Sequence, residues 1–90
     1  MNLSLRFHPR AKKQLTSALA KHYKQIHEKI LSLTNNPYPQ DSRHMAGYPG
    51  YFRVTQGEYR VIYSVTDTTL NIEGIGNKND DPYEVFRRNH

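Results

Sequence analysis

The chain of 90 residues contains no cysteine, so it has no disulfide, no thiolate nucleophile and no cysteine-based metal site. A small chain without disulfides is more typical of the cytosol than of secreted proteins, and we expect a cytoplasmic location. It also lacks an apolar run of transmembrane length, and the first six residues lack the apolar core of a secretion signal. Its length suits one small domain, residues 1–90, with no membrane partner.

Acidic residues are scarce in the first half of the chain. Residues 1–45 hold eight lysines and arginines against two acids, a net charge of +6, whereas residues 46–90 have a net charge of −1. A basic half of this kind fits a polyanion such as nucleic acid, or an acidic protein partner. A solvated basic helix is the alternative interpretation.

The five histidines show no metal-binding spacing. His22 and His27 are five residues apart, whereas a helical metal-binding pair needs four. The sequence therefore predicts no metal and no cofactor.

Apolar periodicity predicts a strand followed by helix. Residues 3–7 alternate between apolar and polar, and Pro9 suits the first position of a helix. From Ala11 to Leu33 apolar residues recur every three or four positions, and Asn35-Asn36-Pro37 ends the pattern. No glycine or proline marks a break, so one helix of about 24 residues and two helices in a hairpin both remain open.

Three further strands are predicted at about 51–56, 58–66 and 69–76, with a turn at Asp67-Thr68 and a short helix after Asp81-Pro82. This order predicts an α+β fold, in which an antiparallel sheet of about four strands carries helices on one face. The other face would be free, and it would carry Tyr51, Arg53, Thr55, Arg60, Ile62 and Glu73.

An arginine interrupts the apolar strand from Gly57 to Tyr63. The alternation directs Tyr59, Val61, Tyr63 and Val65 to one face and Arg60 to the other. A two-residue turn at Gln56-Gly57 would place Arg53 directly opposite Arg60. Like charges so placed repel, so the pair predicts an anion between them, with phosphate as the obvious candidate.

Taken in order, several short segments resemble the RelE/ParE toxin superfamily of bacterial toxin–antitoxin pairs. They are the strand with Phe7, the helical segments 11–19 and 26–33, Asn36-Pro37, Ala46-Gly47, the strand around Arg53, residues 57–63, and Gly76-Asn77-Lys78 leading to Tyr83. The resemblance implies a sheet with an N-terminal α-helical hairpin on one face, and therefore two helices. It also implies a cognate antitoxin protein as partner.

Two activities follow from this resemblance. RelE-type members cut messenger RNA, usually in the A site of the 30S ribosomal subunit, by attack of a ribose 2′-hydroxyl on the adjacent phosphate. That reaction needs a base, an acid and positive charge on the phosphate, but no metal. ParE-type members instead poison DNA gyrase and need no nuclease residues. We expect the messenger RNA endonuclease, with the gyrase inhibitor as the alternative.

The resemblance also assigns candidate catalytic residues. Arg60 matches the strand arginine that clamps phosphate, and Arg53 matches a basic position on the preceding strand. Lys78 stands where arginine is commoner, and Tyr83 matches a tyrosine that stacks on a base or assists proton transfer. Thr55 stands where some members carry a lysine, so one candidate base is absent.

Other residues have secondary or structural interpretations. His44 is a possible base, because some members use histidine. Arg60 has a structural alternative, an ion pair with Glu58 or Glu73, and Tyr83 has another, packing of the C-terminal segment. The expected RNA-binding cations are Arg10, Lys12, Lys13 and Arg43.

Overall fold

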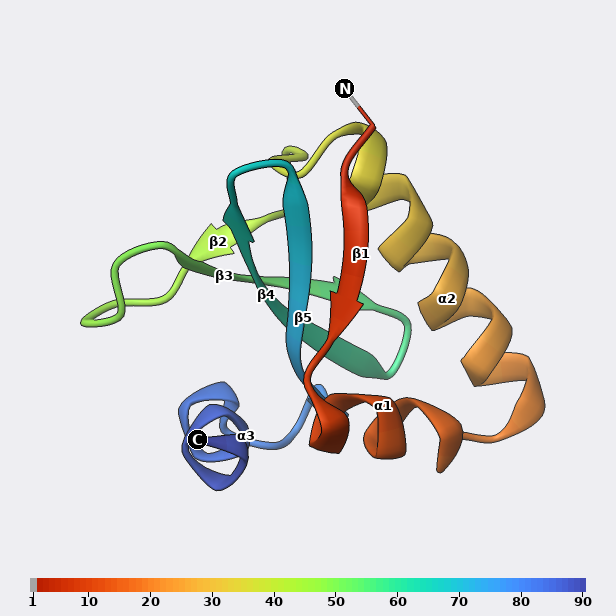
Figure 1. The fold of residues 1–90 in the computed structure, drawn as a ribbon. Helices are drawn as coiled ribbons and strands as arrows, with labels where there is room; N and C mark the ends of the chain where they lie inside the picture. Colours follow the sequence, from red (N-terminus) through yellow and green to blue (C-terminus); the bar gives the residue numbers. More distant parts are fainter. Residues whose placement is uncertain (1) are drawn as a thin grey trace.

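The computed structural model describes residues 2–90 as three helices and a five-stranded sheet (Figure 1). The predicted domain begins at Met1, and this residue lies outside the described residues. None of the helices within residues 2–90 has the length and apolar character that a membrane crossing requires. The elements are β1 (Ser4–Phe7), α1 (Pro9–Thr16), α2 (Ala20–Asn35), β2 (Arg43–His44), β3 (Tyr51–Gln56), β4 (Tyr59–Thr66), β5 (Thr69–Asn77) and α3 (Pro82–Asn89).

The strands are ordered β1-β5-β4-β3-β2. The β1–β5 pair is parallel and the other pairs are antiparallel. The predicted α+β class is confirmed. The sheet has one strand more than expected because Arg43 and His44 pair with β3, and two residues are too short a segment for an alternation pattern to reveal.

The apolar stripe forms two helices, separated at Ser17–Leu19. The hydroxyls of Thr16 and Ser17 both donate to the carbonyl of Lys13, which also accepts from the backbone N–H of Ser17 at the end of α1. The break rotates the next residues away from the core, so that Leu19 is 66% exposed and Tyr23 is 38% exposed. Hydroxyl side chains therefore mark the break that no glycine or proline marked.

The two N-terminal helices cover one face of the sheet. Helix α1 lies against β5, and α2 lies against β3 and β4. The face they cover carries the alternating side chains of β4, since Val61 and Tyr63 are fully buried there and Tyr59 and Val65 pack beside them. This is the main core, and its fully or nearly fully buried helix residues are Ala11, Leu15, Ile26, Ile30 and Leu33.

The predicted register between β3 and β4 is wrong by two residues. Gln56 pairs with Tyr59, so the turn is Gly57-Glu58, and Arg53 pairs with Ile62 rather than with Arg60. Gly57 has a φ of +60°, and this turn gives the left-handed position to glycine rather than to glutamine. A slip of two residues preserves the face on which each side chain lies, so Arg53 and Arg60 still share one face.

The sequence predicts that the second face of the sheet is free. In the structure, helix α3 covers part of this face. Figure 1 shows α3 on the side of the sheet opposite α2. Val85 and Phe86 of α3 bury Ile62 and Met45 in a small second cluster. Close contact requires glycine on β5, because a Cβ at Gly76 would lie 2.8 Å from Val85 Cγ2.

Candidate functional site

The part of the second face beyond α3 carries a row of arginines. Arg43 of β2 pairs directly with Arg53 of β3, and Arg60 of β4 is the diagonal neighbour of Arg53 on the same face. Such diagonal neighbours lie about 7–8 Å apart between their Cα atoms. Like charges are therefore adjacent, as the sequence predicted, although the directly opposed pair is Arg43 and Arg53. This arrangement favours an anion that lies across the row.

Arg60 carries a buried donor without a partner. Its Nη1 donates to the backbone carbonyl of Asp80 at 3.3 Å, while its Nε is buried and has no hydrogen-bond partner among the described residues. Buried polar groups are nearly always paired, and the exceptions concentrate at functional sites. The guanidinium is thus positioned by the segment between β5 and α3, and no carboxylate among residues 2–90 forms an ion pair with it.

The structure contradicts the ion pairs considered for Arg60. Glu58 faces Lys78, whose Nζ lies 3.4 Å from Glu58 Oε1. Glu73 is buried, and it accepts a hydrogen bond from Ser64 and lies 3.3 Å from Nε2 of His90. Neither carboxylate neutralises the arginine row.

Lys78 lies beside the β3–β4 turn. Its backbone N–H donates to the carbonyl of Glu58 at 2.7 Å, which continues the β4–β5 ladder past the end of the strand. By the alternation of the ladder, Lys78 and Glu58 lie on the face of Arg60. Their ion pair is about half exposed, and such a pair contributes less than about 1 kcal/mol, so an anion can displace Glu58 from the lysine.

Tyr83 lies at the border between α3 and the arginine row. The backbone N–H of Ala46 donates to its hydroxyl at 2.8 Å, and its ring lies 5.8 Å from the ring of Tyr48. The tyrosine therefore holds the β2–β3 loop against α3. Its hydroxyl proton remains available for donation, because a phenol can accept and donate at once.

His44 lies on the other face of the sheet. It pairs with Phe52, and its ring contacts the ring of Phe52 at 5.3 Å, on the side of the main core. The structure therefore separates this candidate base from the arginines. Within residues 2–90 no group of three or more histidine, aspartate or glutamate side chains is placed to hold a metal ion.

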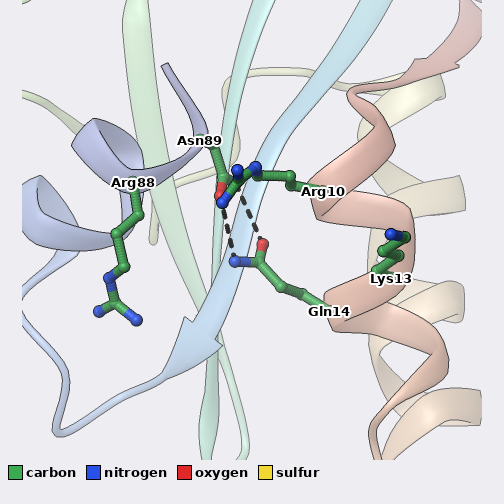
Figure 2. A pocket seen from close by; sticks show the side chains of 5 residues that line it. All are labelled: Arg10, Lys13, Gln14, Arg88 and Asn89. Carbon is green, nitrogen blue, oxygen red and sulfur yellow. Dashed lines mark hydrogen bonds between the residues drawn. The ribbon is translucent and has the colours of Figure 1, made fainter.

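The expected RNA-binding cations lie in different places. Arg43 belongs to the arginine row, with Nη1 donating to the carbonyls of Gln40 and Ser42, and Lys12 is exposed on α1. Arg10 and Lys13 line an open cleft of about 240 Å³ between α1 and α3 (Figure 2). The remaining lining residues are Gln14, Arg88 and Asn89.

Sequence reasoning missed two residues of these regions, Asp80 and Arg88. Asp80 acts through its backbone carbonyl, which no side-chain pattern reveals. Arg88 lies in the last turn of α3, where a basic residue is favoured by the helix dipole and gives no special signal.

The fold is that of a small α+β toxin of the RelE/ParE superfamily. Residues 5–82 match the sequence profile of the family described as "ParE toxin of type II toxin-antitoxin system, parDE". The chain belongs to this family. A comparison with curated protein sequences finds no significant match.

Solved structures share the fold. The archaeal RelE–RelB complex of Pyrococcus horikoshii OT3 contains a chain that is 27% identical, with a TM-score of 0.77, 90% of this chain and 100% of that chain being covered. A mutant of the E. coli toxin RelE in the free state is 19% identical, with a TM-score of 0.79 and coverage of 98% and 97%. The RelBE2 toxin–antitoxin complex of Mycobacterium tuberculosis is 20% identical, with a TM-score of 0.74 and coverage of 87% and 100%.

Proposed function

We propose that residues 1–90 act as one toxin domain that cleaves messenger RNA in the cytoplasm, in the A site of the 30S ribosomal subunit. The observation that carries the proposal is that Arg60 and Arg53 share one face of the sheet and that neither forms an ion pair with a carboxylate among residues 2–90. A phosphodiester supplies the anionic oxygens that two adjacent guanidinium groups without carboxylate partners favour, and two forks can bind it at several oxygens.

The chemistry is transfer of the phosphate within the RNA. The ribose 2′-hydroxyl gives its proton to solvent water while its oxygen forms a bond to the adjacent phosphorus. The bond from phosphorus to the 5′-oxygen breaks, that oxygen takes up a proton, and a 2′,3′-cyclic phosphate and a 5′-hydroxyl result. Arg60 and Arg53 stabilise the negative charge on the non-bridging oxygens, and Lys78 adds positive charge from the turn. Tyr83 stacks on a base or donates its proton to the departing 5′-oxygen.

Substitution of Arg60 tests this role. We expect Arg60→Ala to lower RNA cleavage by about 10²–10³-fold, because it removes a cation that stabilises the transition state. Primer extension on a translated message after induction measures cleavage, and urea unfolding of the purified chain measures stability. Arg60→Lys keeps the charge without the fork and should retain part of the activity.

The matched control is Arg6→Ala, which removes an exposed arginine from β1. It should leave cleavage and growth inhibition unchanged. Full cleavage by a folded Arg60→Ala variant would exclude Arg60 from catalysis. Comparison of cleavage with and without ribosomes would then show whether the reaction depends on the ribosome.

Inhibition of DNA gyrase is the second candidate function, because the matching family is that of ParE toxins. This activity needs no phosphate-binding face, so Arg60→Ala should remain toxic under it. A supercoiling assay with purified gyrase separates the two functions. Inhibition of supercoiling without RNA cleavage would favour the gyrase inhibitor.

We also propose an antitoxin protein as partner, as in the RelE–RelB complexes of similar fold. The solvent side of α2 offers an apolar surface, since Leu19, Tyr23 and Leu31 are exposed at intervals of four and eight residues. A disordered antitoxin segment can fold over such a surface and bury it. Co-purification with the product of the adjacent gene tests this, and Leu31→Glu should weaken the complex. Failure of that product either to bind or to relieve toxicity would contradict the pairing.

A further inference from the structure

We infer that the cleft between α1 and α3 is a second phosphate-binding site, which anchors the RNA at a point away from the bond that is cut. The inference rests on the proposed function and deepens it. It concerns the affinity for RNA, whereas the arginine row concerns the chemistry.

Three cations from two helices line the cleft, and no acid does. Arg10 and Lys13 come from α1 and Arg88 from α3. Figure 2 shows Arg10 extending from α1 toward Asn89 of α3. None of the ion pairs among residues 2–90 includes Arg10, Lys13 or Arg88. On α3 itself, Glu84 pairs with Arg87. The three cations of the cleft are therefore not committed to ion pairs within the described residues.

A pair of amides forms the floor of the cleft and fixes its shape. Gln14 and Asn89 exchange hydrogen bonds of 3.1 and 3.3 Å. The same two side chains bind the backbone of β5, since Gln14 accepts from Ile75 N–H and Asn89 donates to the carbonyl of Glu73. Both helices are thus held to one strand, and the cations stand on a rigid base rather than on mobile loops. The amides bind one another and β5, which leaves the cations to bind the ligand.

The composition of the cleft favours a nucleic acid over an antitoxin segment. All five lining residues are polar or charged. A disordered segment that folds on binding must bury apolar surface to offset its loss of entropy. The exposed stripe on α2 presents large apolar side chains for this purpose, and none lines the cleft. Binding to a phosphate backbone needs only cations, and arginine forks match phosphate oxygens.

The cleft is separated from the arginine row by α3. Tyr83 and Arg88 are five residues apart on this helix, which places them about 140° apart around its axis and about 7.5 Å apart along it. A phosphate in the cleft therefore belongs to a different segment of the RNA from the one beside Tyr83. Loss of the cleft should raise KM and leave kcat unchanged.

The test is binding of a fluorescein-labelled 20-nucleotide RNA with 2′-O-methyl riboses, which cannot be cleaved. The cleft variant carries Arg10→Gln, Lys13→Gln and Arg88→Gln, and the control carries Arg6→Gln, Lys21→Gln and Lys24→Gln at exposed positions outside the cleft. We expect fluorescence anisotropy to show about tenfold weaker binding for the cleft variant only. For this variant, the slope of log affinity against log salt concentration should be smaller in magnitude by about 0.7 for each phosphate that it no longer neutralises.

Several outcomes would overturn the inference. Equal weakening in both variants would reduce the cleft to general surface charge. Unchanged RNA binding together with loss of the antitoxin would assign the cleft to the protein partner. Wild-type chain that binds no RNA, or RNA binding that ignores the cleft, would overturn this inference alone. The proposed nuclease stands or falls separately, by primer extension on a translated message with Arg60→Ala. If the triple variant does not fold, Arg88→Gln alone should still weaken binding about threefold.

Discussion

The two faces of the sheet are built in different ways. The face under α1 and α2 is covered by a continuous apolar core that includes Ile26, Ile30, Val61 and Tyr63, all fully buried. The opposite face is covered only in part, by the single helix α3 over a small cluster around Ile62. The remainder carries Arg43, Arg53 and Arg60 side by side.

This difference separates stability from function. Burial of apolar side chains supplies most of the free energy of folding, so the helix-covered face holds the fold. Adjacent arginines contribute nothing to that energy and repel one another, and they are tolerated because the other face is already stable. The following predictions test this division, from the largest expected effect to the smallest.

Truncation of the main core should have the largest effect. Ile30→Ala should lower the free energy of unfolding by about 2–5 kcal/mol, because it leaves a cavity in a fully buried site. Ile62→Ala should lie near the lower end of that range, since α3 can move toward the sheet and fill part of the space. Urea unfolding measures both, and equal losses would mean that the two faces form one cooperative core.

Gly76→Val should displace α3 from the sheet. The new side chain would meet Val85, with Cβ only 2.8 Å from Val85 Cγ2, and overpacking of this kind costs about 1–3 kcal/mol. Hydrogen exchange should show reduced protection in α3 and unchanged protection in α2. The control is Thr55→Val, at an exposed position on the same face, which should change neither the stability nor the protection of α3. Full protection of α3 in the Gly76→Val variant would refute this account of the glycine.

Tyr63→Phe should cost about 1 kcal/mol at neutral pH, because the Tyr63 hydroxyl donates to the carbonyl of Pro37 at 2.6 Å. Burial raises the pKa of Tyr63 to about 12, so the folded chain keeps a proton that the unfolded chain releases near pH 10. The contribution of the protonated Tyr63 to the free energy of unfolding is therefore complete below about pH 10, and it is lost as the pH rises toward about 12. The free energy of unfolding of the wild type should fall more steeply across this interval than that of Tyr63→Phe. Parallel pH profiles would count against this role, and the exposed Tyr38→Phe is the control.

Asp41→Asn should have the smallest effect, less than about 1 kcal/mol, because the carboxylate is about half exposed. The hydrogen bond from Lys29, at 2.8 Å, lowers the pKa of Asp41. The stabilisation is present above the usual pKa of an aspartate and is lost as the pH falls through the lowered value. Thermal unfolding at pH 7 and pH 2 should show a larger difference between wild type and variant at pH 7, and high salt should reduce that difference.

Local patterns predicted those features that depend on neighbours in the chain. Alternation located β1 and β3 to β5 and identified the buried face of β4, and Pro9 marked the start of α1. The shared face of Arg53 and Arg60 followed from the same alternation, and it survived an error in the turn because the error was two residues. The resemblance to the RelE/ParE superfamily supplied the helical hairpin, which periodicity alone left open.

The sequence alone thus determined the helical and extended segments other than β2, and the face on which the side chains of β3 and β4 lie, because both follow from the period of the backbone. Only the tertiary structure decided which residues stand opposite one another and where α3 rests. Those depend on a φ value at Gly57, on the absence of a Cβ at Gly76 and on the carbonyl of Asp80 beside Arg60. The cleft of Arg10, Lys13 and Arg88 has the same origin, since the Gln14–Asn89 pair joins residues 75 positions apart in the chain. Contacts over such distances follow from packing of the whole chain, which no local pattern records.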